Sequence, residues 1–166
     1  MSNLPTTEVL VRGSAILATI CYAMRGLIDA RGRNEEKPRQ GARNIWSAGC
    51  GCLCFHVFSA FLLQHHWSHA AAWEHTRQRT LELTGFNSGD GLYANYAMTI
   101  IWLIDVTGWW TRLDWPRRFR VWYWAVQIFF AFMVVNATLV FGPWYWWIAA
   151  AVMAISILGL RRREGG

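Results

Sequence analysis

The sequence predicts an all-α integral membrane protein, a single domain over residues 1–166 built as a bundle of about five transmembrane helices. Three observations predict this fold. The 166 residues are 54% hydrophobic and only 16% charged, against roughly 25% charged in an ordinary soluble domain. The charges are segregated, since no Asp, Glu, Lys or Arg interrupts the 40 residues between Arg120 and Arg161 or the 30 between Arg43 and Glu74. Twelve residues are tryptophan, which collects at membrane interfaces.

A transmembrane helix needs about 20 mostly apolar residues, so the longer uncharged stretch holds two predicted spans and the shorter stretch holds one. In the first span, Arg12 and Arg25 stand near the ends, where long cationic side chains reach the membrane surface. The third span carries Asp105, and the dipeptide Gly142-Pro143 breaks the chain between the last two spans. In order, the predicted spans cover residues 8–28, 45–66, 91–110, 121–141 and 144–160.

The basic residues set the orientation of the predicted bundle. With five spans, the first loop, the third loop and the C-terminal tail lie on one side, and the other side holds only Arg77 and Arg79. Cytoplasmic loops carry the excess of basic residues, so we expect the N-terminus outside and the C-terminus in the cytoplasm. The basic residues on the cytoplasmic side are Arg31, Arg33, Lys37, Arg39 and Arg43, then Arg112, Arg117, Arg118 and Arg120, and finally Arg161, Arg162 and Arg163.

This pattern predicts a multi-pass protein of the bacterial inner membrane. The net charge of +6 is explained by the predicted cytoplasmic loops, so it favours contact with anionic lipid head groups and does not require a nucleic acid. We expect the lipid bilayer as the first partner, and either a homo-oligomer or a larger membrane complex beyond it.

The histidines form the clearest functional pattern, because all five fall within 20 residues. Histidine is the commonest metal ligand and titrates near neutral pH. If the second helix continues to about Leu83, then His65, His66 and His69 share an arc of about 100° on one helix face. Three imidazoles leave an open position on Cu, Zn or Fe. The pattern therefore predicts a redox-active or metal-handling transition-metal site near the outer, periplasmic face.

Two other interpretations of these histidines stay open. One is an interfacial helix end that contacts lipid head groups together with Trp67 and Trp73, and the other is a proton or pH sensor. His75 is the weakest candidate ligand, because we expect it on the solvated continuation of the helix. A loop that folds back would bring His75, Glu74 or Asp90 to the metal.

His56 lies about halfway along the second span, where an ionisable residue is costly and marks a functional candidate. Small residues stand near it in the sequence, among them Ser47, Gly51 and Ala60, and they would let a flat macrocycle approach. His56 is therefore a candidate ligand of a haem or a chlorophyll-type pigment. The alternative is a neutral imidazole that is hydrogen-bonded to a neighbouring helix.

Other polar residues within the spans are candidates for a pocket or a proton relay. Asp105 and Gln127 lie at similar depths towards the cytoplasm. A buried carboxylate is paired or protonated, so we expect Asp105 either to pair with Arg25 or to relay protons with His56.

A second polar level lies in the outer third of the spans, at about the depth of His65 and His66. Convergence of these side chains would form an outward-opening pocket suited to a small ligand or cofactor. The residues of this level are Asn95, Tyr96 and Asn136.

Three short segments are distinctive: His-His-Trp-Ser-His-Ala from His65, Gly-Leu-Tyr-x-Asn-Tyr from Gly91 and Trp-Leu-x-Asp from Trp102. They resemble a set of uncharacterised small bacterial membrane proteins over residues 45–110, which implies no function. In span number and tryptophan content the chain is also similar to the tryptophan-rich sensory protein family. That family's Lys-Pro-x-Trp-x-Pro-Pro-like segment is absent, because residues 36–40 read Glu-Lys-Pro-Arg-Gln, so no residue roles are carried over.

The principal functional prediction is an inner-membrane protein that binds a transition metal through His65, His66 and His69. The first alternative is a small integral subunit of a larger membrane complex, in which His56 ligates a haem or pigment. The second is a proton-coupled channel or carrier that uses His56, Asp105 and the outer pocket. The sequence leaves open whether the protein is an enzyme.

Overall fold

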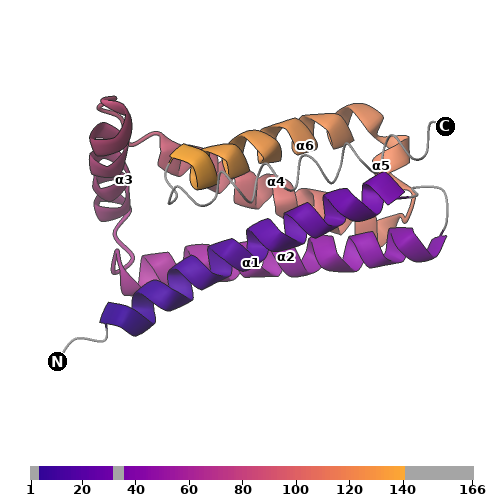
Figure 1. Ribbon diagram of the computed structural model, residues 1–166, viewed down its shortest axis with the longest axis horizontal. Coiled ribbons are helices and arrows are strands. Elements are labelled where there is room, and N and C mark those ends of the chain that lie inside the picture. The colour runs from indigo at the N-terminus through magenta and orange to yellow at the C-terminus, as the bar shows by residue number, and fades with distance from the viewer. Residues whose placement is uncertain (1–3, 32–35, 141–166) are drawn as a thin grey trace.

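The computed structural model describes residues 4–31 and 36–140, and these residues are helical apart from short connections, with no strand among them (Figure 1). Four helices run in alternating directions along the bundle, and two further helices lie at its opposite ends (Figure 1). We call these ends the α3 end and the α5 end. The elements are α1 (Leu4–Arg31), α2 (Glu36–Leu63), α3 (His69–Thr84), α4 (Gly91–Thr111), α5 (Trp115–Arg118), α6 (Arg120–Val135) and the π-helical turn η1 (Asn136–Val140).

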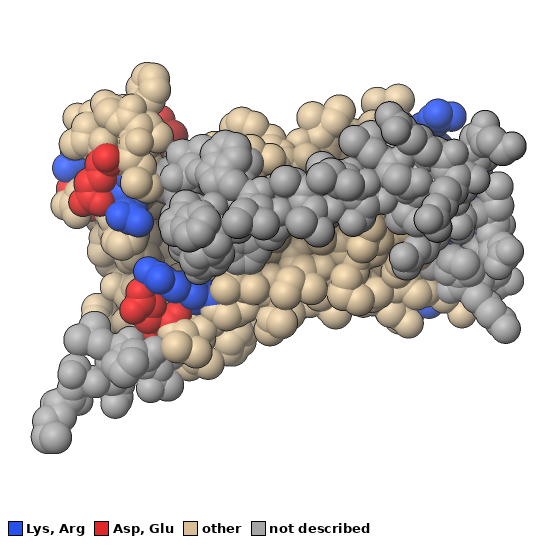
Figure 2. All heavy atoms as spheres, viewed as in Figure 1, with Lys and Arg blue, Asp and Glu red and all other residues tan. Residues whose placement is uncertain are grey.

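Three of the described helices are long and apolar enough to cross a membrane, over Thr7–Asp29, Arg39–Leu63 and Arg120–Thr138. In Figure 2 the charged side chains lie at the two ends of the coloured surface, and its middle shows none. These features are those of a membrane protein. The 21 residues of α4 extend about 31 Å, but α4 is not among the three. The predicted span 144–160 lies outside the described residues.

One buried carboxylate organises the α5 end. Asp105 on α4 is 4% exposed and accepts hydrogen bonds from three indole N–H groups. Trp46 of α2 donates to Oδ2 at 2.9 Å, and Trp115 of α5 and Trp122 of α6 donate to Oδ1 at 3.0 and 2.8 Å. An ionised carboxylate only accepts, at about four lone-pair sites, so the indoles satisfy it without a cation. This one side chain joins four helices.

Arg25 pairs with Asp29 on its own helix, and the predicted pair between Arg25 and Asp105 is wrong. Arg25 Nε lies 3.0 Å from Asp29 Oδ2, and the Tyr123 hydroxyl donates to the same oxygen at 2.9 Å. The guanidinium is fully buried among aromatic faces, where its charge is stabilised by cation–π contacts. The ring centroids lie at 4.5, 5.0 and 5.1 Å from Arg25 Cζ, for Trp46, Trp109 and Tyr123 in turn.

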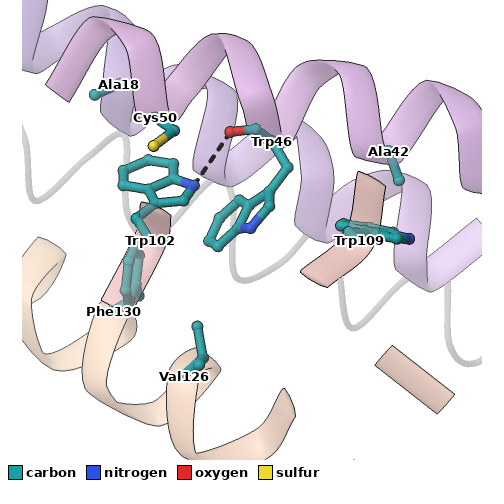
Figure 3. Packing of buried hydrophobic residues seen from close by; sticks show 8 residues of the cluster. All are labelled: Ala18, Ala42, Trp46, Cys50, Trp102, Trp109, Val126 and Phe130. Atoms are coloured by element: carbon teal, nitrogen blue, oxygen red, sulfur yellow. Dashed lines mark hydrogen bonds between the residues drawn. The ribbon is translucent and has the colours of Figure 1, made fainter. Parts of the chain in front are cut away.

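The centre of the bundle is an aromatic cluster of Trp46, Trp102 and Phe130 (Figure 3). The Trp46 centroid lies 4.5 Å from that of Trp102 and 5.2 Å from that of Phe130. The Trp102 indole donates to the Trp46 backbone carbonyl at 3.1 Å. Gly49 leaves room for this packing, because a Cβ at residue 49 would lie 2.8 Å from both Cys21 Cβ and the Trp102 ring.

Replacing Asp105 by Asn should destabilise the α5 end, because an amide offers fewer acceptor sites and turns an NH₂ group towards indole donors. A hydrogen bond to a charged group contributes about 1.5–3 kcal/mol, so we expect the free energy of unfolding in detergent to fall by about 2–4 kcal/mol. Denaturant titration followed by near-ultraviolet circular dichroism measures this loss. The control is Asp114→Asn, at an exposed position without a side-chain cap hydrogen bond, and equal losses in the two variants would refute the role of Asp105.

A second prediction concerns the contact at Gly49. Gly49→Ala forces the Trp102 ring or Cys21 to move, and overpacking of this kind costs about 1–3 kcal/mol. Gly51→Ala is the matched control two residues away, because nothing lies within 4 Å of its new Cβ. We expect Gly51→Ala to stabilise the helix by about 0.5–1 kcal/mol. Opposite changes in melting temperature for the two variants would support the close packing of α1, α2 and α4, and matching changes would contradict it.

Candidate functional site

A cavity of about 320 Å³ lies among α1, α2, α4 and α6, towards the α3 end of the bundle. This volume falls at the lower end of the roughly 300–1,000 Å³ typical of ligand sites. The part of the wall nearest the centre is largely apolar, with Ala15, Ala18, Leu53, Met98 and Trp102 among its residues. The polar residues of the wall at the α3 end are Gln64, His65, His75, Thr76, Asn95 and Tyr96.

The predicted continuation of the second helix to Leu83 is wrong, because α2 ends at Leu63. His66 and Trp67 adopt left-handed backbone angles, with φ of 47° and 60°, which are uncommon for residues other than glycine. The Trp67 ring turns back towards Phe58 and Phe61 at the end of α2. Ser68 then begins a new helix, since its Oγ accepts the Ala71 N–H at 3.2 Å, as N-cap serines do.

This break separates the three predicted metal ligands. His65 lines the cavity, whereas His66 and His69 are exposed on either side of the turn. His69 Nδ1 lies 3.1 Å from the Tyr96 hydroxyl. The shared helix face on which the three-histidine prediction rested is therefore not formed. Within residues 4–31 and 36–140, no group of three His, Cys, Asp or Glu side chains is placed to hold a metal ion.

His75, which we expected to be solvated and the weakest ligand, contacts His65. The two ring centroids lie 5.4 Å apart with the planes at 58°, because α3 crosses the end of the bundle (Figure 1) and brings His75 over the cavity. Burial, together with the nearby charges of His75 and His66, lowers the pKa of His65. His65 is thus neutral at pH 7, which is the form that ligates metals. Ser68, a typical N-cap residue, was the signal in the sequence for this turn.

His56 is hydrogen-bonded to a neighbouring helix, through Nδ1 to the Val11 carbonyl of α1 at 2.8 Å. A carbonyl only accepts, so Nδ1 carries the proton, and Nε2 of the neutral ring is then an acceptor. The ring lines the cavity. Among the residues that the structure describes, Nε2 has no hydrogen-bond partner.

The other predicted residues fall into two groups. Asn95 and Tyr96 line the cavity, whereas the Asn136 amide donates to the Phe132 carbonyl of its own helix at 2.9 Å. The structure brings four predicted residues to the cavity wall, namely His56, His65, Asn95 and Tyr96. The predicted residues that do not line it are His66, His69, Asp105, Gln127 and Asn136.

Comparison with known proteins finds no family, no curated protein and no solved structure that matches this chain. The resemblance of residues 45–110 to small bacterial membrane proteins therefore stays a prediction. Function has to be inferred from the chemistry of the cavity and of the histidines around it.

Proposed function

We propose that this protein is a five-span protein of the bacterial inner membrane that binds a small molecule in the cavity at its outer, α3 end. The cavity is the observation that supports the proposal. Its wall is mostly apolar, and a few polar groups converge on it from different helices, which is typical of sites for small molecules. His56, His65, Asn95 and Tyr96 are the binding residues in this proposal.

The charges of the loops support the proposed orientation. The α5 end carries Arg112, Arg117, Arg118 and Arg120. On α3, the guanidinium of Arg77 lies 2.6 Å from Glu74 and that of Arg79 lies 3.1 Å from Glu82. The α3 helix carries only these two arginines, against the four at the α5 end, and such a smaller share of basic residues is expected for a segment on the outer face.

The sequence-based alternatives are affected differently. A proton relay from His56 to Asp105 loses its main support, because the Asp105 oxygens accept from three tryptophans. The role of a subunit with a haem or pigment on His56 stays a prediction. A carrier function is compatible with the proposed ligand site and would use the cavity in transport.

Filling the cavity should weaken binding of a small molecule. We expect 2-methoxynaphthalene, a small apolar probe, to bind the detergent-solubilised protein saturably, with one site per chain in equilibrium dialysis. Ala60→Trp places an indole in the cavity wall and should weaken binding at least tenfold. Ala125→Trp adds the same side chain at an exposed position of α6 outside the cavity and should change nothing. Equal affinities in these two variants would show that the probe binds elsewhere.

Metal binding at the mouth of the cavity is a second candidate function, favoured by the contact between His65 and His75. Two imidazoles on one tetrahedral ion, with nitrogens about 2.1 Å from the metal, place their centroids about 5 Å apart. The observed 5.4 Å is close to this distance. The pair would leave positions on Cu, Zn or Fe open to water or to a ligand, as metal handling or redox chemistry requires. In this proposal the pair of His65 and His75 takes the place of the predicted metal site of His65, His66 and His69.

The metal proposal is tested with two double variants. His65→Ala/His75→Ala should lose saturable Zn²⁺ binding in calorimetry, and His66→Ala/His69→Ala should keep it, although it removes the same number of imidazoles. Binding to the wild type should weaken at acid pH, because protonated imidazoles do not ligate metals, and the lowered pKa of His65 places the loss of this ligand below the ordinary imidazole pKa of about 6.5. Equal Zn²⁺ binding by both double variants would exclude the pair as the site.

A further inference from the structure

We propose that the molecule bound in the cavity is an uncharged, mainly apolar alcohol or phenol whose hydroxyl donates a hydrogen bond to Nε2 of His56. This inference rests on the proposed function and specifies the chemistry of its ligand. The juxtaposition that supports it is an anchored imidazole, with a fixed tautomer and an unpartnered acceptor nitrogen, in the wall of an otherwise mostly apolar cavity.

The hydrogen bond from His56 to Val11 determines that a ligand has to supply a hydrogen-bond donor. With Nδ1 held as the donor to the Val11 carbonyl at 2.8 Å, the neutral imidazole presents only a lone pair at Nε2. His56 is half-buried, and an acceptor that faces a mostly apolar cavity without a partner is costly, as is a hydroxyl moved from water into an apolar site. A ligand hydroxyl that donates to Nε2 removes both costs at once.

Three hydroxyls of the cavity wall already donate within the protein. The hydroxyl of Thr19 donates to the Ala15 carbonyl at 3.0 Å, and that of Thr76 donates to the Ala72 carbonyl at 2.9 Å. The Tyr22 hydroxyl donates to the Gln127 backbone carbonyl at 3.3 Å. None of these hydroxyls donates to Nε2 of His56, which leaves that nitrogen open to a donor from a ligand.

The rest of the wall excludes charged ligands and limits size. Among the described residues, no Asp, Glu, Lys or Arg lines the cavity, so an ionic ligand would lose its hydration without gaining a counter-charge. Val11, Ala15, Leu53, Val57 and Ala60 supply apolar contacts around the level of His56. A volume of about 320 Å³ fits a compound of one or two rings.

The test compares two probes of similar shape, of which only one has a hydroxyl donor. Calorimetry at pH 7 measures binding of 2-naphthol, which has a hydroxyl, and of its methyl ether, 2-methoxynaphthalene. One net hydrogen bond corresponds to about a tenfold difference in affinity, so we expect the wild type to prefer 2-naphthol about tenfold. His56→Phe keeps a ring of similar shape and removes the acceptor, so it should bind both probes with the affinity of the ether. His56→Gln, which restores an acceptor oxygen, should recover part of the preference.

Each contrary outcome would overturn a different claim. Equal binding of the two probes by the wild type would overturn the hydroxyl inference and leave the cavity as a ligand site. An unchanged tenfold preference in His56→Phe would also overturn it. No saturable binding of either probe would refute the proposed function itself. A Soret band in purified wild-type protein that disappears in His56→Phe would assign Nε2 to a haem and exclude the alcohol or phenol.

Discussion

The hydrogen bonds from three tryptophans to Asp105 fix the architecture at the α5 end. A carboxylate within an apolar bundle has to be satisfied or neutralised, and here the donors come from α2, α5 and α6 while the acceptor is on α4. Moving α2, α5 or α6 away from α4 would leave an indole donor unpaired. Arg25 contacts the face of one of these three rings, Trp46, rather than the carboxylate.

The two ends of the bundle are built differently, and this difference positions the candidate site. At the centre and towards α5, large rings fill the space between the helices, with Trp46, Trp102 and Phe130 in mutual contact. Towards α3, the facing residues are small, such as Ala15 and Ala60, and they leave the cavity between them. The short helix α3 then crosses this end and adds His75 to its wall.

The sequence was informative where helical composition decides the structure. Runs of apolar residues predicted the three described helices that are long and apolar enough to cross a membrane, and a carboxylate at residue 105 was singled out as unusual. Its partners were not predictable, because indole donors from three helices are brought together only by tertiary packing, and a cation was the simpler expectation. The prediction that three histidines share one helix face was wrong for a local reason. Two residues with left-handed backbone angles, at positions 66 and 67, redirect the chain. Because the helix is interrupted there, spacing along the sequence does not predict which histidine rings are in contact.

The use of tryptophans as partners of Asp105 has a consequence for the orientation of the helices. A hydrogen bond weakens steeply as its angle falls, and each indole has a single N–H donor on a rigid ring. The three contacts with Asp105 therefore constrain the rotation of α2, α5 and α6 about their own axes as well as their distances from α4.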